Sequence, residues 1–272
     1  MKKLLMAAVA ALAVLGGRMD AQNLPQMEEF PFDEGEKISY AVSYNWLGVM
    51  TDVAFGHMAV EKEKDLYHTI LFCKTAKFFD VFFRVYEDYE SWFDGKIVPW
   101  KGSRDSKEGS YWATNQKVYH WGSNSVHVDI DKSSKGKSTV DVNLKKGTLD
   151  LPSILYYVRN ADVDAMTVGK QVPLTYLMDK SITELMLTYR GIENKYVKGI
   201  GTVRCHRFGI SVVSDELFEN NEDAQMWITD DQNRVIAYFI APLKIGAVGG
   251  RMTGYEGLKY PFDALVSTKR VK

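Results

Sequence analysis

Apolar and aromatic residues alternate with polar or small ones along much of the chain. Ile38, Tyr40, Val42, Tyr44 and Trp46 form the longest such series. Successive side chains of a β-strand point to opposite faces of a sheet, so a period of two indicates a strand with one buried face. The pattern therefore predicts a half-buried antiparallel strand that begins near residue 37.

The same alternation recurs in short segments separated by turn sequences, about every 8–12 residues, as is typical of a β-meander. Asn115-Gln116 and residues 229–233 are among the predicted turns. The further predicted strands lie around residues 53–58, 67–74, 112–114, 118–121, 126–130, 140–144, 172–177, 182–189, 203–213, 225–228 and 235–240.

One segment has the pattern of a helix. Asp150 is suited to the N-cap, Pro152 to the first turn and Arg159 to the last turn, so we predict a short helix near residues 151–160. The predicted fold class is all-β: twisted antiparallel meander sheets that form an open barrel or a sandwich, with this one helix. The order of strands and turns is similar on both sides of the helix, which leaves two similar halves, 30–149 and 150–265, as an open alternative.

Composition supports a folded protein with a sizeable core. The 272 residues are 46% hydrophobic and 25% charged, which excludes disorder, collagen-like repeats and a coiled coil as the main class. The formal net charge of −1 argues against a general nucleic-acid-binding surface.

The N-terminus resembles a secretory signal peptide. Lys2 and Lys3 precede an apolar run that ends near Leu15, and Ala21 is suited to the cleavage position. We expect residues 1–21 to be removed, which leaves residues 22–272 as a single β-rich domain in the periplasm or outside the cell. No cysteine directly follows the apolar run, so we do not expect a lipoprotein. The apolar run is too short to span a bilayer and no later apolar stretch is long enough, so we expect no transmembrane span.

Cys73 and Cys205 are the two cysteines, and both lie in apolar, strand-like segments. An oxidising compartment permits a disulfide between them. Two separate buried thiols that pack as small hydrophobic residues are the alternative.

The most unusual segment is aromatic, at residues 78–94. We predict a turn of helix at residues 77–82 followed by a strand from Arg84. Such a segment could line a pocket or meet lipid or a partner, or it could be a stripe that faces the core. On the first interpretation, the candidate ligand-binding residues are Phe82, Phe83, Tyr86, Tyr89 and Trp92.

The same segment carries carboxylates that could act as an acid and base pair. In a strand, Glu87 faces away from Asp88 and Glu90, and a glycosidase pair needs two carboxyl groups across one cleft. Asp88, Glu90 or Asp94 would serve an envelope hydrolase, but the pattern favours solvated charges on an exposed face. The five histidines are scattered, and no nucleophile or phosphate-loop motif is present, so we predict no catalytic residue, no metal and no cofactor.

Several short motifs follow one another over roughly residues 30–260. Their residues are Gly35, Glu36, Tyr40, Gly48, Tyr89, Ser91, Asp94, Pro99, Asp150, Ser153, Arg159, Gly169, Trp227, Asp231 and Arg234. Taken in this order, they resemble a family of bacterial envelope proteins, the domain of unknown function 3108. Asp52, Val235 and Ile236 depart from the family's pattern of turn residues. The resemblance implies an exported, mostly β protein with no assigned catalytic residue.

These observations favour an exported, non-enzymatic binding or envelope-assembly protein. We expect its ligand to be a hydrophobic small molecule, a lipid or a glycan on an aromatic-lined face, or its partner to be an envelope protein. An envelope hydrolase that acts on glycan or peptide through paired carboxylates is the alternative.

Overall fold

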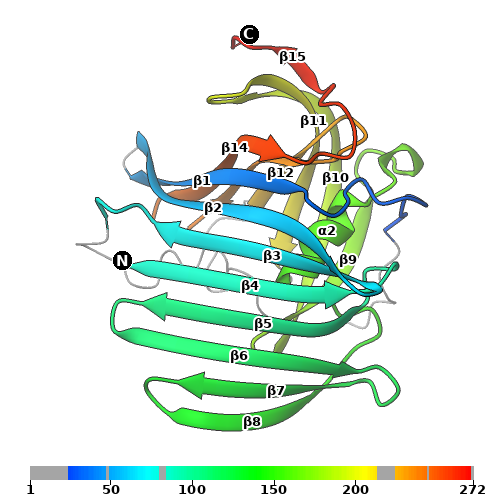
Figure 1. The fold of residues 1–272 in the computed structure, drawn as a ribbon. Coiled ribbons are helices and arrows are strands. Elements are labelled where there is room, and N and C mark those ends of the chain that lie inside the picture. Colours follow the sequence, from blue (N-terminus) through cyan, green and yellow to red (C-terminus); the bar gives the residue numbers. More distant parts are fainter. Residues whose placement is uncertain (1–23, 47–48, 80–83, 213–223, 244, 271–272) are drawn as a thin grey trace.

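A single antiparallel β-sheet, strongly curved around one helix, makes up the fold (Figure 1). The computed structural model describes residues 24–46, 49–79, 84–212, 224–243 and 245–270. The sheet does not close on itself, so of the two predicted arrangements the chain adopts the open barrel. The prediction of an all-β fold with one short helix is confirmed.

The first half of the described chain is a meander in which each strand pairs with the next. Its strands are β1 (Lys37–Trp46), β2 (Val49–Glu63), β3 (Leu66–Thr75), β4 (Val85–Phe93), β5 (Pro99–Glu108), β6 (Tyr111–His120), β7 (Ser125–Lys132) and β8 (Gly136–Asn143).

The second half begins with the helix and continues as another meander. Its elements are α2 (Leu151–Arg159), the 3-10 turn η1 (Val163–Ala165), β9 (Gln171–Met178), β10 (Ser181–Val197), β11 (Gly201–Val212), β12 (Ala224–Thr229), β13 (Ile236–Pro242), β14 (Ala247–Glu256) and β15 (Leu265–Ser267).

The two meanders join through the pairing of β1 with β14. The sheet therefore runs from β8 through β1 to β14 and then to β9, with β15 paired to β11 outside this path. Successive strands of a sheet twist with a fixed hand, so a sheet of this length curls. Its two end strands, β8 and β9, come round toward each other.

Helix α2 lies on the concave side of the sheet and packs against β3, β4 and β9 (Figure 1). The predicted N-cap, Pro152 in the first turn and Arg159 in the last turn are all confirmed. Ile154, Tyr156 and Val158 of the helix belong to the main hydrophobic core, together with inward-facing residues of both meanders. The helix therefore fills space that would be the lumen of a barrel.

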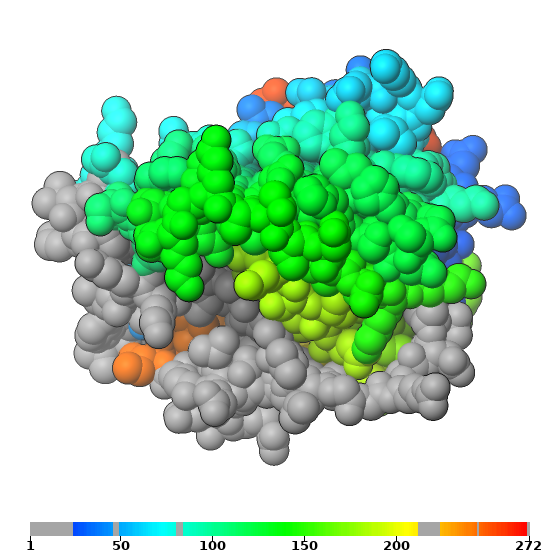
Figure 2. Space-filling model, turned by 90° about the horizontal axis from the view of Figure 1, so that it is seen from below, coloured from blue at the N-terminus to red at the C-terminus, as the bar shows by residue number. Residues whose placement is uncertain are grey.

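Side-chain packing closes the gap between the two sheet ends. Seen from below, β5–β8 lie directly over β9 and β10 (Figure 2). Leu177 of β9 packs in a second hydrophobic cluster with Tyr119 of β6 and Val128 of β7. Leu149, beyond β8, forms the one isolated bridge between described residues of the two sheet ends, to Tyr176 of β9. We call the contact between the two sheet ends, formed by this cluster and the Leu149 bridge, the seam.

Two sequence predictions fail on the strands nearest the seam. Residues Asn115-Gln116 are not a turn but lie in the middle of β6, and β5 was not predicted at all. Both errors have one cause: the inward positions of these strands include Arg104, Ser106 and Asn115, which are polar yet buried. A polar interior removes the alternation on which the prediction depends.

Candidate functional site

A buried carboxylate fixes the N-terminal end of the helix to the sheet. Asp150 accepts hydrogen bonds from Ser91 Oγ of β4 (2.8 Å) and Tyr119 Oη of β6 (3.3 Å). It also accepts from the backbone N of Ser153 (3.0 Å), while Ser153 Oγ accepts from the Asp150 backbone N, which completes a capping box. Every one of these groups is buried, so the helix start is held in one position.

A second buried cluster lies beside this end of the helix, around Arg104 of β5. Its guanidinium pairs with Glu87 of β4 (3.1 Å) and with Asp179 in the β9–β10 turn (2.9 Å), which also accepts from Asn115 of β6. Burial opposes the charge, but the neighbouring Tyr89, Glu87 and Asp179 outweigh it and raise the pKa of Arg104. The cluster therefore ties the β9–β10 turn to β4–β6 across the seam.

A small pocket opens between this cluster and the helix, with room for about one water molecule. Lys117 of β6 lines it and is only 5% exposed, yet among the described residues its ammonium makes no hydrogen bond or ion pair. Burial lowers the pKa of Lys117, and Asp150 and Asp179 offset only part of that shift. The pocket is lined by Tyr89, Glu90, Ser103, Lys117, Asp150, Leu151, Pro152, Tyr176, Leu177, Met178 and Asp179.

The other end of the helix is fixed by a fully buried ion pair. Arg159 donates to both carboxylate oxygens of Glu36 (2.6 and 2.9 Å) and to the backbone oxygens of Asn233 and Arg234 (2.9 and 3.0 Å). Its guanidinium also lies 5.4 Å from the centre of the Phe32 ring. This pair connects the helix end to the entry of β1 and to the β12–β13 turn.

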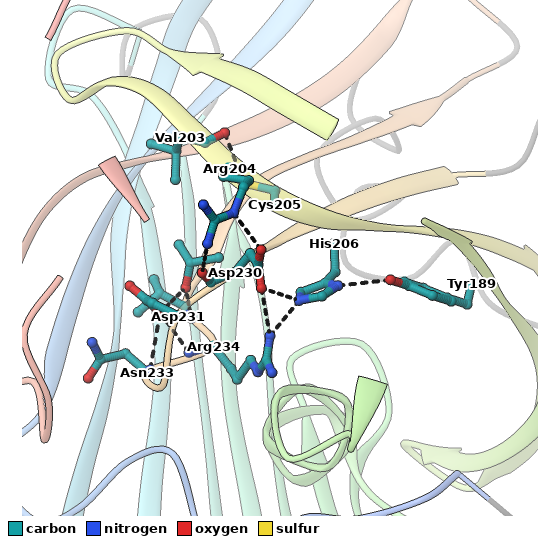
Figure 3. Close-up of polar contacts among 11 residues, drawn as sticks. Tyr189, Val203, Arg204, Cys205, His206, Asp230, Asp231, Asn233 and Arg234 are labelled. Carbon is teal, nitrogen blue, oxygen red and sulfur yellow. Dashed lines mark hydrogen bonds and ion pairs between the residues drawn. The ribbon is translucent and has the colours of Figure 1, made fainter. Parts of the chain in front are cut away.

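A chain of polar contacts joins that turn to β10 and β11 (Figure 3). Tyr189 Oη lies 2.9 Å from His206 Nδ1, and His206 Nε2 lies 2.8 Å from Asp230 Oδ1. Arg234 contacts the same imidazole nitrogen, and Arg204 donates to the other oxygen of Asp230. Burial, and then the charge of Arg234, lower the pKa of His206.

This chain has the order of a nucleophile, a base and an orienting carboxylate, with Tyr189 in the first position. The Asp230 carboxylate favours a proton on Nε2 of His206, whereas the guanidinium of Arg234, which can only donate, favours the same nitrogen without a proton. Burial raises the pKa of Tyr189. The contacts therefore hold β10, β11 and the β12–β13 turn together.

The structure separates the predicted ligand-binding residues. Phe82 and Phe83 lie outside the described residues. Tyr89 faces the interior, where it is buried and lines the pocket, whereas Tyr86 and Trp92 lie on the outer face of β4 and are half-buried. The described members therefore form neither a single aromatic face nor a single stripe that faces the core.

The outer aromatic rings are already in contact with side chains of the neighbouring strands. His68 stacks on Trp92 at 4.1 Å with an interplanar angle of 3°, and Lys101 lies 5.9 Å from the Trp92 ring centre. Lys107 lies 5.0 Å from the ring centre of Tyr86. These cross-strand pairs stabilise the sheet face.

The predicted carboxylates separate as the strand geometry requires. Glu87 faces inward to Arg104, while Asp88 and Glu90 lie on the outer face. Burial and the nearby Glu90 raise the pKa of Asp88. Asp94 lies in the following turn, where its carboxylate accepts from the backbone N of Lys96 and of Val98. Asp94 thus shapes a turn.

Cys73 and Cys205 are both free thiols, on β3 and β11. Of the two alternatives, the structure shows the separate thiols. Burial raises the pKa of Cys73 to about 12 and that of Cys205 still further, so neither is a reactive thiolate.

The β1–β2, β3–β4 and β13–β14 connections lie at the same end of the sheet, the left end in Figure 1. The four most exposed large apolar residues of the described chain are Phe78 (75%), Val168 (70%), Ile245 (69%) and Val49 (65%). Three of them lie at this end. We call Val49, Phe78 and Ile245 the apolar end.

Strand pairing and hydrogen bonds place these three residues at the same end of the sheet. Trp46 pairs with Val49 at the tip of the β1–β2 hairpin, and Tyr44 Oη donates to the backbone oxygen of Ile245 in the adjacent β13–β14 turn (2.8 Å). The chain that follows β3 continues along the start of β2, because the backbone N of Ala76 donates to the oxygen of Val53. Val168 precedes β9, at the opposite end of the sheet.

Sequence analysis missed both the Arg104 cluster and the apolar end. A polar strand with Arg104 and Ser106 two residues apart was the available signal for the cluster. An apolar residue beside a turn glycine, as Val49 is to Gly48 and Ile245 to Gly246, was the signal for the apolar end.

Within the described residues, no three His, Cys, Asp or Glu side chains are grouped so that they could hold a metal ion. None of the helices in the described ranges is long and apolar enough to cross a membrane.

Fold and contacts together define an open, helix-filled β-barrel whose buried polar groups anchor the helix at both ends. The model of the family described as "Protein of unknown function (DUF3108)" matches residues 39–253, and the chain belongs to this family. The expected family is therefore confirmed. No curated protein matches the chain.

Two solved structures show similarity to the chain. One is a β-barrel-like protein of the domain of unknown function DUF1849 from Brucella abortus, with 9% sequence identity, a TM-score of 0.49, and coverage of 81% of this chain and 96% of that chain. The other is a presumed lipoprotein from Parabacteroides distasonis ATCC 8503, with 9% identity, a TM-score of 0.31, and coverage of 85% of this chain and 99% of that chain.

Five of the residues that carried the family resemblance fix the helix to the rest of the fold. Asp150, Ser91 and Ser153 anchor the helix start, and Glu36 with Arg159 anchors its end. Part of the family's motif pattern therefore coincides with the residues that fix helix α2 in place.

Proposed function

We propose that this chain is an exported, non-enzymatic binding protein of the cell envelope that acts through the apolar end of its barrel. The exposure of Val49, Phe78 and Ile245 on adjacent turns is the observation that carries this proposal. Large apolar side chains gathered on a surface mark sites where a partner or an apolar ligand is bound.

Two further observations support a binding role over a catalytic one. Two buried cations of the interior, Arg159 and Arg104, are engaged in anchoring the helix and the seam. The helix also occupies the centre of the barrel, so an apolar ligand is better placed at the end of the barrel than inside it. An apolar end favours a lipid-like molecule over a glycan, because sugars need polar partners as well as aromatic faces.

Native mass spectrometry of the mature protein, purified from its own envelope, tests the proposal. Extraction of a parallel sample with organic solvent identifies any bound hydrophobic molecule. We expect a bound hydrophobic molecule or envelope partner with the unmodified chain and its loss in the variants Phe78→Asp and Ile245→Asp. Val168→Asp is the matched control, because Val168 is equally exposed at the opposite end of the sheet.

An unmodified chain that is recovered empty and alone would overturn the proposal. So would binding that Val168→Asp weakens as much as Phe78→Asp does. The same spectrum reports the mass of the N-terminus and so tests cleavage after Ala21.

A further inference from the structure

Resting on the proposed function, we infer that the apolar end docks on a phospholipid surface, with Phe78, Ile245 and Val49 inserted among the lipids and Lys74 and Lys77 at the level of the phosphates.

The shape of the apolar end fits a lipid surface. Its three residues belong to separate parts of the chain: Val49 begins β2, whereas Phe78 and Ile245 lie in the β3–β4 and β13–β14 connections. Each side chain is more than half exposed. A flat protein partner would leave gaps between such projections, whereas lipid chains rearrange around each of them.

Two lysines flank the apolar residues. Lys74, near the end of β3, and Lys77, in the turn beside Phe78, are both exposed, and neither makes an ion pair with another described residue. An ammonium on a flexible apolar stem can reach phosphate while the stem lies along apolar surface. Protein interfaces are depleted in lysine, but membrane-binding surfaces are rich in it.

The apolar residues carry the proposal more strongly than the lysines. Burial of a large apolar side chain contributes more to binding than one lysine near an anionic surface. We therefore expect the apolar substitutions to have the larger effect.

Flotation of the mature chain with vesicles of phosphatidylcholine, and with vesicles that also contain phosphatidylglycerol, tests the inference. The variants are Phe78→Asp, Ile245→Asp and the double variant Lys74→Gln with Lys77→Gln. Val168→Asp is the control, and the midpoint of unfolding in urea verifies that each variant is folded.

We expect the unmodified chain to float with both kinds of vesicle. Each apolar substitution should weaken binding about tenfold or more, because it removes one buried apolar side chain and adds a charge. The double lysine variant should weaken binding to the phosphatidylglycerol vesicles by about fivefold for each lysine. Val168→Asp should bind within about twofold of the unmodified chain.

A chain that floats with neither kind of vesicle overturns the inference, as does equal weakening by Val168→Asp and Phe78→Asp. If native mass spectrometry still shows a molecule or partner that Phe78→Asp releases, the proposed function stands while the lipid surface is excluded. A dimer that Phe78→Asp converts to a monomer would assign the apolar end to a second copy of the chain and also overturn the inference.

Discussion

Arg104 and Lys117 are cations on adjacent strands of the same interior, but their surroundings differ. Arg104 has two carboxylate partners and a hydroxyl within hydrogen-bonding distance, whereas Lys117 has none among the described residues. A buried charge without partners lowers stability, and removal of one member of a buried pair leaves the other uncompensated. The two residues should therefore respond in opposite ways to the same substitution.

Lys117→Met should leave the free energy of unfolding within about 1 kcal/mol of the unmodified chain or increase it, because an unpaired buried ammonium is replaced by an apolar group. Arg104→Met should lower it by about 3–5 kcal/mol, because Glu87 and Asp179 lose their partner. Urea denaturation followed by tryptophan fluorescence measures both.

Equal losses in the two variants would show that Lys117 is stabilised by its surroundings as Arg104 is. The triple substitution of Arg104, Glu87 and Asp179 by apolar residues should recover part of the loss caused by Arg104→Met, which separates the unpaired charges from the change of volume.

His206 should make stability depend on pH. Its folded pKa is lowered by burial, so between about pH 7.5 and 5.5 the unfolded chain binds a proton that the folded chain does not. The contribution is fully present above the unfolded pKa and is lost as the pH falls toward the folded pKa. The melting temperature should fall more over this range for the unmodified chain than for His206→Gln.

The other four histidines are present in both proteins, so the difference between the two pH profiles belongs to His206. An NMR titration of the imidazole gives the folded pKa directly. A value above about 6.5 would contradict the prediction. The groups that face the imidazole are Tyr189, Asp230, Arg234, Arg204 and Asp164.

At the scale of elements, helix α2 is short and depends on its surroundings. A helix of 9 residues is marginal in water, and most of its stability comes from packing and from its ends. Asp150 and Arg159 bind the two ends to β4, β6, the entry of β1 and the β12–β13 turn. Polar contacts with the rest of the fold therefore fix both ends of the helix.

Asp150→Ala should lower the free energy of unfolding by about 2–4 kcal/mol, because it removes the N-cap and leaves Ser91 and Tyr119 without their acceptor. Asp162→Ala is the matched control. Asp162 occupies the N-cap position of η1 but makes no cap hydrogen bond there, so its substitution should cost less than about 0.5 kcal/mol. Chemical denaturation distinguishes the two, and similar losses would show that the cap does not matter.

Elements with an apolar inner face were predictable from the sequence, and those with a polar one were not. The alternation in β1 and the cap and Pro152 of α2 gave those elements correctly. In β5 the inward residues are Gly102, Arg104 and Ser106, so nothing in the local sequence marks a buried face. The apolar end escaped prediction because its residues come together only when hairpins from both halves of the chain pair.

For the whole molecule, the pairing of β1 with β14 makes the two meanders depend on each other. Glu36 and Arg159, whose contact anchors the helix, are 123 positions apart in the sequence. No local pattern reveals such a contact, which is why the buried ion pair could not be predicted. We therefore expect the two meanders to fold as one unit.

Residues 22–149 alone should therefore lack a fixed tertiary structure. This fragment contains β1–β8 but neither the helix that fills the concave face nor β14, the second partner of β1. We expect a weak near-UV circular dichroism signal and no cooperative unfolding transition. A fragment that unfolds cooperatively would instead favour two similar halves that fold independently.

The seam has a consequence for how this architecture can change. A barrel closed by backbone hydrogen bonds has a fixed number of strands, and adding one strand shifts the stagger of all the others. Here β8 and β9 are not paired with each other: the sheet ends meet through side chains and through the isolated bridge of Leu149 to β9, so a continuous hydrogen-bond registry does not set the circumference. A hairpin could be lost or gained after β8 while every other strand kept its partners, provided that the new end strand presented an apolar face to Leu177.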